Sequence, residues 1–186
     1  MKHGMRPALD WPRRTANALA AIALACASPA WAAKPHQHGV AQLDIGVDPG
    51  RVTLLLEMPL DSLVGFERAP RSDAERAQIE AALERLRSAA TLFRIDPAAQ
   101  CTAGPVVLQS AVLGLGTAAA DSKDGHADVE ASAEFTCKNG TKAGFVEVGL
   151  FEAFPRLQRV DVQTATPRGQ MKATLKRPVS RVPLAR

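Results

Sequence analysis

Five side chains of types that bind transition-metal ions are spaced at a period of two on two short segments. His36 and His38 are two residues apart, so on an extended chain both point to one side. His126, Asp128 and Glu130 follow the same period of two on a segment that alternates polar and apolar residues. Zinc takes three or four nitrogen, sulfur or carboxylate ligands. If the two segments are neighbouring strands, these five residues form a candidate zinc site.

Other interpretations of the same residues stay open. Charged residues are common on exposed edge strands, where they hinder aggregation, so the polar row can be a solvated face without a ligand. Asp128 and Glu130 could also act as a pair of catalytic carboxylates. The sequence has no Gly-x-Ser-x-Gly, no glycine-rich phosphate loop and no His-Glu-x-x-His, however. We therefore expect that the protein is not an enzyme.

The first 32 residues have the composition of a signal peptide. A basic start precedes a short apolar run over residues 16–27, and Ala30-Trp31-Ala32 is a small-residue cleavage site. The apolar run is too short to span a membrane, so we expect no membrane span. We predict cleavage after Ala32 and export to an oxidising compartment outside the cytoplasm. Anchoring as a lipoprotein at Cys26 is a minor alternative.

Cleavage changes the charge of the chain. The signal segment contains four of the 23 lysines and arginines and one of the 19 acidic residues, which leaves 19 basic and 18 acidic side chains. Both tryptophans leave with it, and the chain has no tyrosine. A net charge near +1 without stacking aromatics argues against a nucleic-acid partner.

Cleavage also leaves two of the three cysteines, Cys101 and Cys137. An even number of cysteines in an exported chain indicates a disulfide, and this bridge would close a loop of about 37 residues. Such a loop contributes roughly 4 kcal/mol in the chain-entropy model. A catalytic or metal-bound thiol is the alternative.

The elements that must position these residues can be located from hydrophobic periodicity. Residues 39–47 and 52–58 alternate around an Asp-Pro-Gly turn, and 127–137 alternates before an Asn-Gly turn and a return strand over 144–150. Further strands are expected over 106–113, 157–165 and 171–175, and the tail after 176 is expected to be loose. Ser72 followed by Glu75 predicts the start of a helix over 73–94.

These elements predict an α+β domain over residues 33–186. Antiparallel hairpins form its sheet, and one long helix covers one face of that sheet. Its apolar turns near Phe66 and from Phe151 to Phe154 could serve as a partner-binding surface instead of packing in the core.

Several motifs resemble a family of periplasmic proteins of Gram-negative bacteria whose domain has no assigned function. The motifs cover nearly the whole chain after the signal peptide: His36-Gln37-His38-Gly39-Val40-Ala41-Gln42-Leu43, Val64-Gly65-Phe66-Glu67-Arg68-Ala69-Pro70, Asp128 to Cys137, Leu150-Phe151-Glu152-Ala153-Phe154-Pro155, Val160-Asp161-Val162-Gln163 and Gly169-Gln170. Some members are described as zinc-regulated and as auxiliaries of the ATP-driven zinc importer. The resemblance therefore implies a periplasmic location, zinc handling, and components of a zinc ABC importer as partners.

The chain departs from the family pattern at two places. Zinc-linked members often carry a histidine-rich run before the Asp-x-Glu strand, and residues 114–125 contain no histidine. The family's Phe-Glu-His is Phe66-Glu67-Arg68 here, so a cation stands in place of an imidazole. The leading interpretation is a zinc-binding accessory of zinc import, and the alternative is an envelope interaction or structural module that uses no metal.

Overall fold

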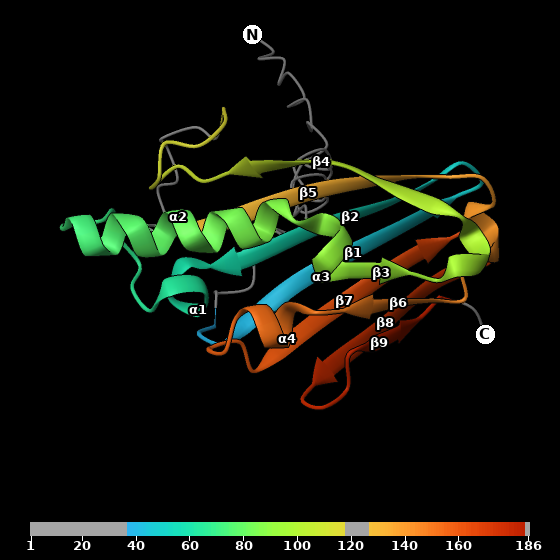
Figure 1. The fold of residues 1–186 in the computed structure, drawn as a ribbon. Helices are drawn as coiled ribbons and strands as arrows, with labels where there is room; N and C mark the ends of the chain where they lie inside the picture. Colours follow the sequence, from blue (N-terminus) through green and yellow to red (C-terminus); the bar gives the residue numbers. More distant parts are fainter. Residues whose placement is uncertain (1–36, 118–126, 185–186) are drawn as a thin grey trace, which may run out of the picture. The chain divides into compact units, whose positions relative to one another are not determined.

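A hairpin of two nine-residue strands lies at the centre of the main sheet (Figure 1). β1 (Val40–Asp48) and β2 (Arg51–Pro59) pair antiparallel around the predicted turn at Pro49 and Gly50. The structure, a computed structural model, describes residues 37–117 and 127–184, which belong to one compact unit. The apolar residues predicted to face inward on this hairpin are all buried: Ala41, Leu43, Ile45, Val47, Val52, Leu54, Leu56 and Met58.

Four more strands complete this six-stranded sheet in the order β4-β5-β2-β1-β7-β8. They are β4 (Cys101–Gln109), β5 (Asp128–Cys137), β7 (Arg159–Thr166) and β8 (Gly169–Lys176). The expected antiparallel pairing holds for every neighbouring pair except β1 and β7, which are parallel. Because that pair joins strands more than 100 residues apart, local hairpin signals could not reveal it.

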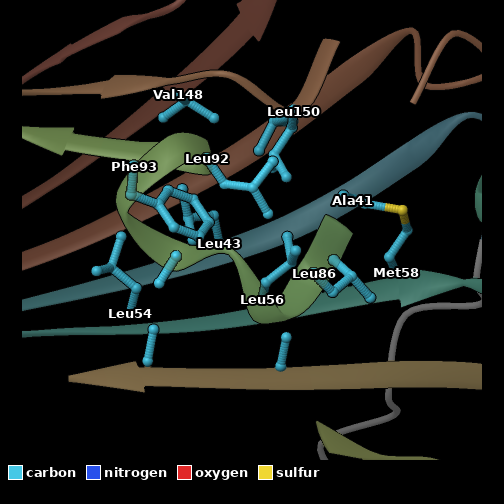
Figure 2. Packing of buried hydrophobic residues seen from close by; sticks show 14 of the residues in the cluster. Ala41, Leu43, Leu54, Leu56, Met58, Leu86, Leu92, Phe93, Val148 and Leu150 are labelled. Atoms are coloured by element: carbon cyan, nitrogen blue, oxygen red, sulfur yellow. The ribbon is translucent and has the colours of Figure 1, made fainter. Parts of the chain in front are cut away.

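A second layer packs on one face of this sheet, and the core lies between the two layers (Figures 1 and 2). It contains helices α1 (Leu60–Val64), α2 (Asp73–Arg87), α3 (Ala89–Leu92) and α4 (Leu150–Ala153), and a small sheet of β3 (Phe93–Ile95), β6 (Phe145–Val148) and β9 (Arg181–Pro183). Two 3-10 turns, η1 (Pro97–Ala99) and η2 (Gly140–Lys142), complete the elements. In the part of the chain that is described, no helix has the length and apolar character needed to cross a membrane.

The predicted helix over 73–94 is shorter than expected. Its start is confirmed, because the Ser72 side chain accepts a hydrogen bond from the Glu75 backbone N–H at 3.2 Å. The helix ends at Arg87, and Ser88 separates it from the single turn of α3. The apolar residues 92 and 93 reach the core through this turn and the start of β3, and four helices share the second layer with the small sheet.

The predicted hairpin around Asn139-Gly140 is wrong, because β5 and β6 belong to different sheets. The chain after β5 runs instead along the turn of the β1–β2 hairpin, where the Gly140 N–H donates to the Pro49 carbonyl at 2.8 Å. A Cβ at position 140 would overlap the Asp48 carbonyl oxygen. Glycine is needed here for close backbone approach and not for a hairpin turn.

The chain after residue 176 is also more ordered than predicted. β9 pairs with β6, and Val182 and Leu184 are buried in the core. Phe151 and Phe154 are buried as well, so the aromatic turn at α4 is part of the core and not an exposed partner-binding surface.

The predicted disulfide is present. Cys101 and Cys137 are directly opposite each other on β4 and β5, and their sulfur atoms are bonded. The bond ties the edge strand β4 to its neighbour at the end of β5 that lies beside the β1–β2 turn, where the Cys137 N–H donates to the Gly50 carbonyl at 2.8 Å. A bonded pair of sulfurs leaves neither thiol available for metal or catalysis.

Gly140→Ala is expected to destabilise the protein by about 1–3 kcal/mol, because the new methyl group forces two backbone segments apart. The free energy of unfolding from urea titration measures this change. Gly50→Ala is the matched control, since nothing lies within 4 Å of a Cβ at that position. Equal stability of the two variants would contradict the close-approach argument.

Replacing both cysteines by alanine is expected to lower the free energy of unfolding by about 2–5 kcal/mol, because the unfolded chain regains the freedom of the closed loop. Adding a reductant to the wild-type protein should produce the same loss. The free energy of unfolding of the double variant should not change when the reductant is added. A change would show that the reductant acts on something other than the Cys101–Cys137 bond.

Candidate functional site

Three of the five predicted metal ligands lie within the described residues, whereas His36 and His126 lie outside them. His38 occupies the turn before β1 and is 67% exposed. Asp128 begins β5 and is half-buried, and Glu130 is exposed on the face of the sheet opposite the core.

The hypothesis that the first strand lies beside the 126–137 strand is wrong, because β2 lies between β1 and β5. Glu130 is opposite Glu57 of β2, which in turn is opposite Gln42 of β1. Two strand spacings separate Glu130 from β1, and His38 lies four residues before Gln42, so the two side chains are on the order of 15 Å apart. Since zinc–ligand bonds are about 2 Å long, His38 and Glu130 do not share one ion.

The structure instead places His38 between two carboxylates that the sequence did not single out as ligands. The distance from His38 Nε2 to Glu67 Oε1 is 3.0 Å, and that from His38 Nδ1 to Asp61 Oδ2 is 3.7 Å. The Asp61 and Glu67 side chains are 25% and 40% exposed, so the group is open to solvent on one side.

The two carboxylates face different nitrogens of the His38 ring: Glu67 faces Nε2, and Asp61 faces Nδ1. An imidazole has one nitrogen on each side, and a metal-bound histidine usually presents its second N–H to a carboxylate or carbonyl. Among residues 37–117 and 127–184, no three His, Cys, Asp or Glu side chains are arranged to hold one metal ion. His38 Nε2 and Glu67 Oε1, 3.0 Å apart, are two possible ligand atoms.

Helix α1 holds Asp61 beside His38. The antiparallel hairpin brings the residues before β1 and those after β2 to the same end of the sheet, and α1 follows β2 directly. A buried hydrogen bond joins the next residue of each segment, because the Gly39 N–H donates to the Ser62 hydroxyl at 2.9 Å. Gly39 has φ +73°, a conformation that favours glycine and turns the chain into β1.

The chain turns sharply at the end of α1 to present Glu67. Gly65 ends the helix with φ +92°, and its Cα faces the Arg156 guanidinium so closely that a Cβ would lie 2.6 Å from Arg156 Cζ. A side chain at position 65 would displace Arg156 and strain the turn, so the glycine sets the direction in which the next residues leave.

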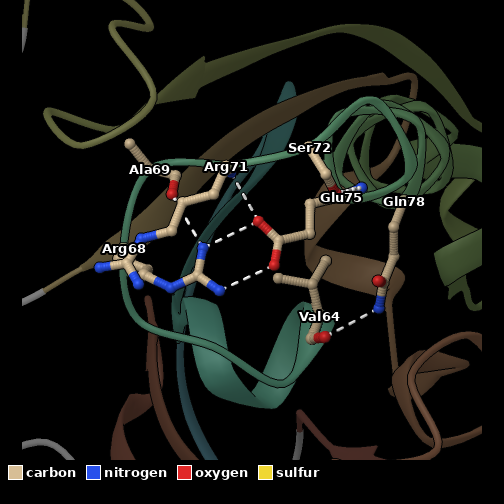
Figure 3. Close-up of polar contacts among 7 residues, drawn as sticks. All are labelled: Val64, Arg68, Ala69, Arg71, Ser72, Glu75 and Gln78. Carbon is tan, nitrogen blue, oxygen red and sulfur yellow. Dashed lines mark hydrogen bonds and ion pairs between the residues drawn. The ribbon is translucent and has the colours of Figure 1, made fainter.

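An ion pair fixes the loop that follows Glu67 to the start of α2 (Figure 3). Arg68 donates two hydrogen bonds to the Glu75 carboxylate, at 2.8 and 2.7 Å, and the Arg71 backbone N–H donates a third at 2.6 Å. The paired Arg68 guanidinium and then the Arg71 N–H lower the pKa of Glu75 to about 2. The Arg68 guanidinium also lies 4.8 Å from the centre of the Phe66 ring.

Arg68 therefore has a structural partner at the position where the resembling family carries a histidine. Its side chain is committed to the N-terminus of α2, and Gln78 of the same helix donates to the Val64 carbonyl at 2.8 Å. These contacts fix both α1 and the loop that contains Glu67 to α2 (Figure 3).

Sequence reasoning missed Asp61 as a neighbour of His38, although a signal was present. A two-residue turn at Pro49 and Gly50 sets the register of the hairpin, which puts the residues before β1 and those after β2 at the same end of the sheet. Glu67 follows α1 on a loop, and no periodicity in the sequence relates it to His38.

Comparison with known proteins identifies one family. A family model described as "ZrgA family zinc uptake protein" matches residues 35–184. The match contains all the residues of the His38 group. No curated protein matches the chain.

Glu75→Gln is expected to lower the melting temperature at pH 7, because the ion pair with Arg68 is lost. The folded-state pKa of Glu75 lies below its ordinary value of 4.5, so its stabilising effect is complete above about pH 4.5 and is lost as the pH falls towards 2. The difference between wild type and variant should therefore shrink over that range in thermal melts. Glu80→Gln on the exposed face of α2 is the control, and a pH-independent difference would contradict the assignment to Glu75.

Proposed function

Since the chain belongs to the ZrgA family of zinc uptake proteins, we propose that it binds zinc in the periplasm and acts as an accessory of zinc import. Its role is to hold and hand over the ion rather than to catalyse a reaction. Components of a zinc ABC importer are the proposed partners, as the sequence resemblance implied. The zinc ion is cargo in this role.

His38 is the observation that carries the proposal within the molecule. It is an exposed imidazole with one carboxylate facing each ring nitrogen, and both imidazole and carboxylate are ligand types that zinc prefers. A solvent-open position also suits an ion that must be taken up and released. His36 and His126 remain the other proposed imidazole ligands.

The location in the periplasm is supported by two features. The predicted signal peptide of residues 1–32 would export the chain, and the Cys101–Cys137 disulfide suits an oxidising compartment. Lipoprotein anchoring at Cys26 stays the minor alternative.

A metal-free interaction module is the second candidate, and the outer face of the main sheet favours it. Leu55 and Val107 are 45% and 56% exposed there. Both lie opposite Ser132 of β5, so they form one row across three strands. A protein partner that covers this row would use a surface unrelated to His38.

Zinc titration calorimetry on the oxidised, metal-stripped and untagged protein tests the proposed function. We expect one-to-one binding with a sub-micromolar dissociation constant, lost in a variant with His36, His38 and His126 all changed to alanine, because no other imidazole remains after the signal peptide. Equally tight binding by the triple variant, or only weak binding by the wild type, would contradict the proposal and favour the interaction module.

Glu130→Gln serves as the internal control of that titration. Its carboxylate is two strands away from His38, so its loss should leave the dissociation constant unchanged. A large loss would instead locate the site on β5, as the spacing of His126, Asp128 and Glu130 predicted.

A further inference from the structure

The outer face of the main sheet, opposite the core, combines an apolar projection with a hollow. Within residues 37–117 and 127–184, no helix or strand covers this face (Figure 1). Leu55 of β2 and Val107 of β4 are large apolar side chains exposed on it. Beside Leu55 lies a hollow of about 590 Å³, where Gly46 and Ala165 are directly paired and leave little side chain above the backbone.

Opposite charges lie on two separate strands of this face. Glu130 and Glu134 are exposed on β5, where they flank Ser132, and Lys172 is exposed on β8. The Glu134 carboxylate is 3.9 Å from the Arg51 guanidinium. In the part of the chain that is described, neither Glu130 nor Lys172 has an ion-pair partner. Four strand spacings separate β5 from β8, a distance of about 19 Å, so the glutamates and the lysine cannot pair within one molecule.

The strand order relates these features by a single rotation. One row of directly paired residues crosses the face from β5 to β8: Ser132, Leu55, Asp44, Gln163 and Lys172. β1 is the middle strand of the five, so a half-turn about an axis that runs above β1 and along it exchanges β5 with β8 and β2 with β7. Two copies related in this way bring Lys172 of each copy over Ser132 of the other, between its two glutamates. Leu55 of each copy comes over Gln163 of the other, at the wall of the hollow.

We propose that two copies of this chain form a symmetric dimer through their outer faces. A two-fold interface uses the same surface on both subunits, so that surface must be complementary to itself. The outer face meets this requirement, because its projection and hollow, and its acidic and basic strands, are placed equally far from one axis. Facing sheets keep their strand directions within about 30° of each other, which suits an axis along β1. The dimer does not depend on zinc or on His38, which lies at the end of the sheet.

The size of the shared surface sets the expected strength of the dimer. Five strands overlap, and β7 and β8 are eight residues long, so the overlap measures about 24 Å by about 26 Å. Such an overlap buries about 1,200 Å² in total, which is the lower end of specific interfaces. We therefore expect a dimer that dissociates in the micromolar range.

Sedimentation velocity of the purified, untagged protein over a range of concentrations tests the dimer. The wild type should change from monomer to dimer as its concentration rises. Leu55→Asp is expected to weaken the dimer about tenfold or more, because it places a charge at the apolar contact. Val179→Asp is the matched control, since Val179 is also exposed but lies outside the main sheet. A wild type that stays monomeric throughout, or equal effects of the two variants, would overturn the proposal.

An exchange of charges tests the pairing of β5 with β8. Lys172→Glu and Glu130→Lys should each weaken self-association about tenfold or more, because each variant places like charges opposite each other. An equimolar mixture of the two variants should dimerise like the wild type, since both lysine–glutamate contacts are restored between unlike copies. Unchanged melting temperatures show that each variant is folded. A mixture that associates no better than its components would overturn the arrangement.

The position of the axis makes one further demand. Asp44 lies under the axis, so its carboxylate faces its own counterpart in the second copy and the two charges repel. Asp44→Asn is expected to tighten the dimer, and asparagine keeps an oxygen that can accept the hydrogen bond from the Gln163 amide. Weaker association of this variant in the same sedimentation experiment would contradict an axis above β1.

Discussion

The candidate site depends on the antiparallel register of the β1–β2 hairpin. A two-residue turn pairs Asp48 with Arg51, and this pairing sets the position of every later residue along both strands. The start of β1 and the end of β2 therefore meet at the same end of the sheet. His38 and α1 are neighbours for this reason, although 23 residues separate His38 from Asp61, and the Gly39–Ser62 hydrogen bond closes the junction.

One-sided burial of the main sheet organises the rest of the molecule. Alternating side chains of β1, β2, β5 and β7 fill one core, and the second layer of helices and short strands covers it (Figure 2). The other face carries the charged and polar residues, including Glu130. The polar face and the His38 group are therefore separate features, one on the surface of the sheet and one at its end, and a metal site formed from both would require strands that are not adjacent.

The Glu67 loop illustrates how a structural contact can support a binding group. Arg68 belongs to the same short segment as Glu67 but points to Glu75, whose low pKa reflects that pairing. Together with the left-handed turn at Gly65, the ion pair limits the positions that Glu67 can take.

The sequence by itself determined the inward-facing residues, the first hairpin, the start of α2 and the Cys101–Cys137 pair, since each follows from periodicity, capping or cysteine count within a short segment. The family resemblance, confirmed by the match over residues 35–184, also came from local motifs. Only the tertiary structure decided that β5 pairs with β2 rather than β1, that β5 and β6 part at Gly140, and that Asp61 and Glu67 face His38. The reason is physical: a local pattern specifies which face of a strand is buried, whereas strand order and loop direction depend on contacts between segments far apart in the chain.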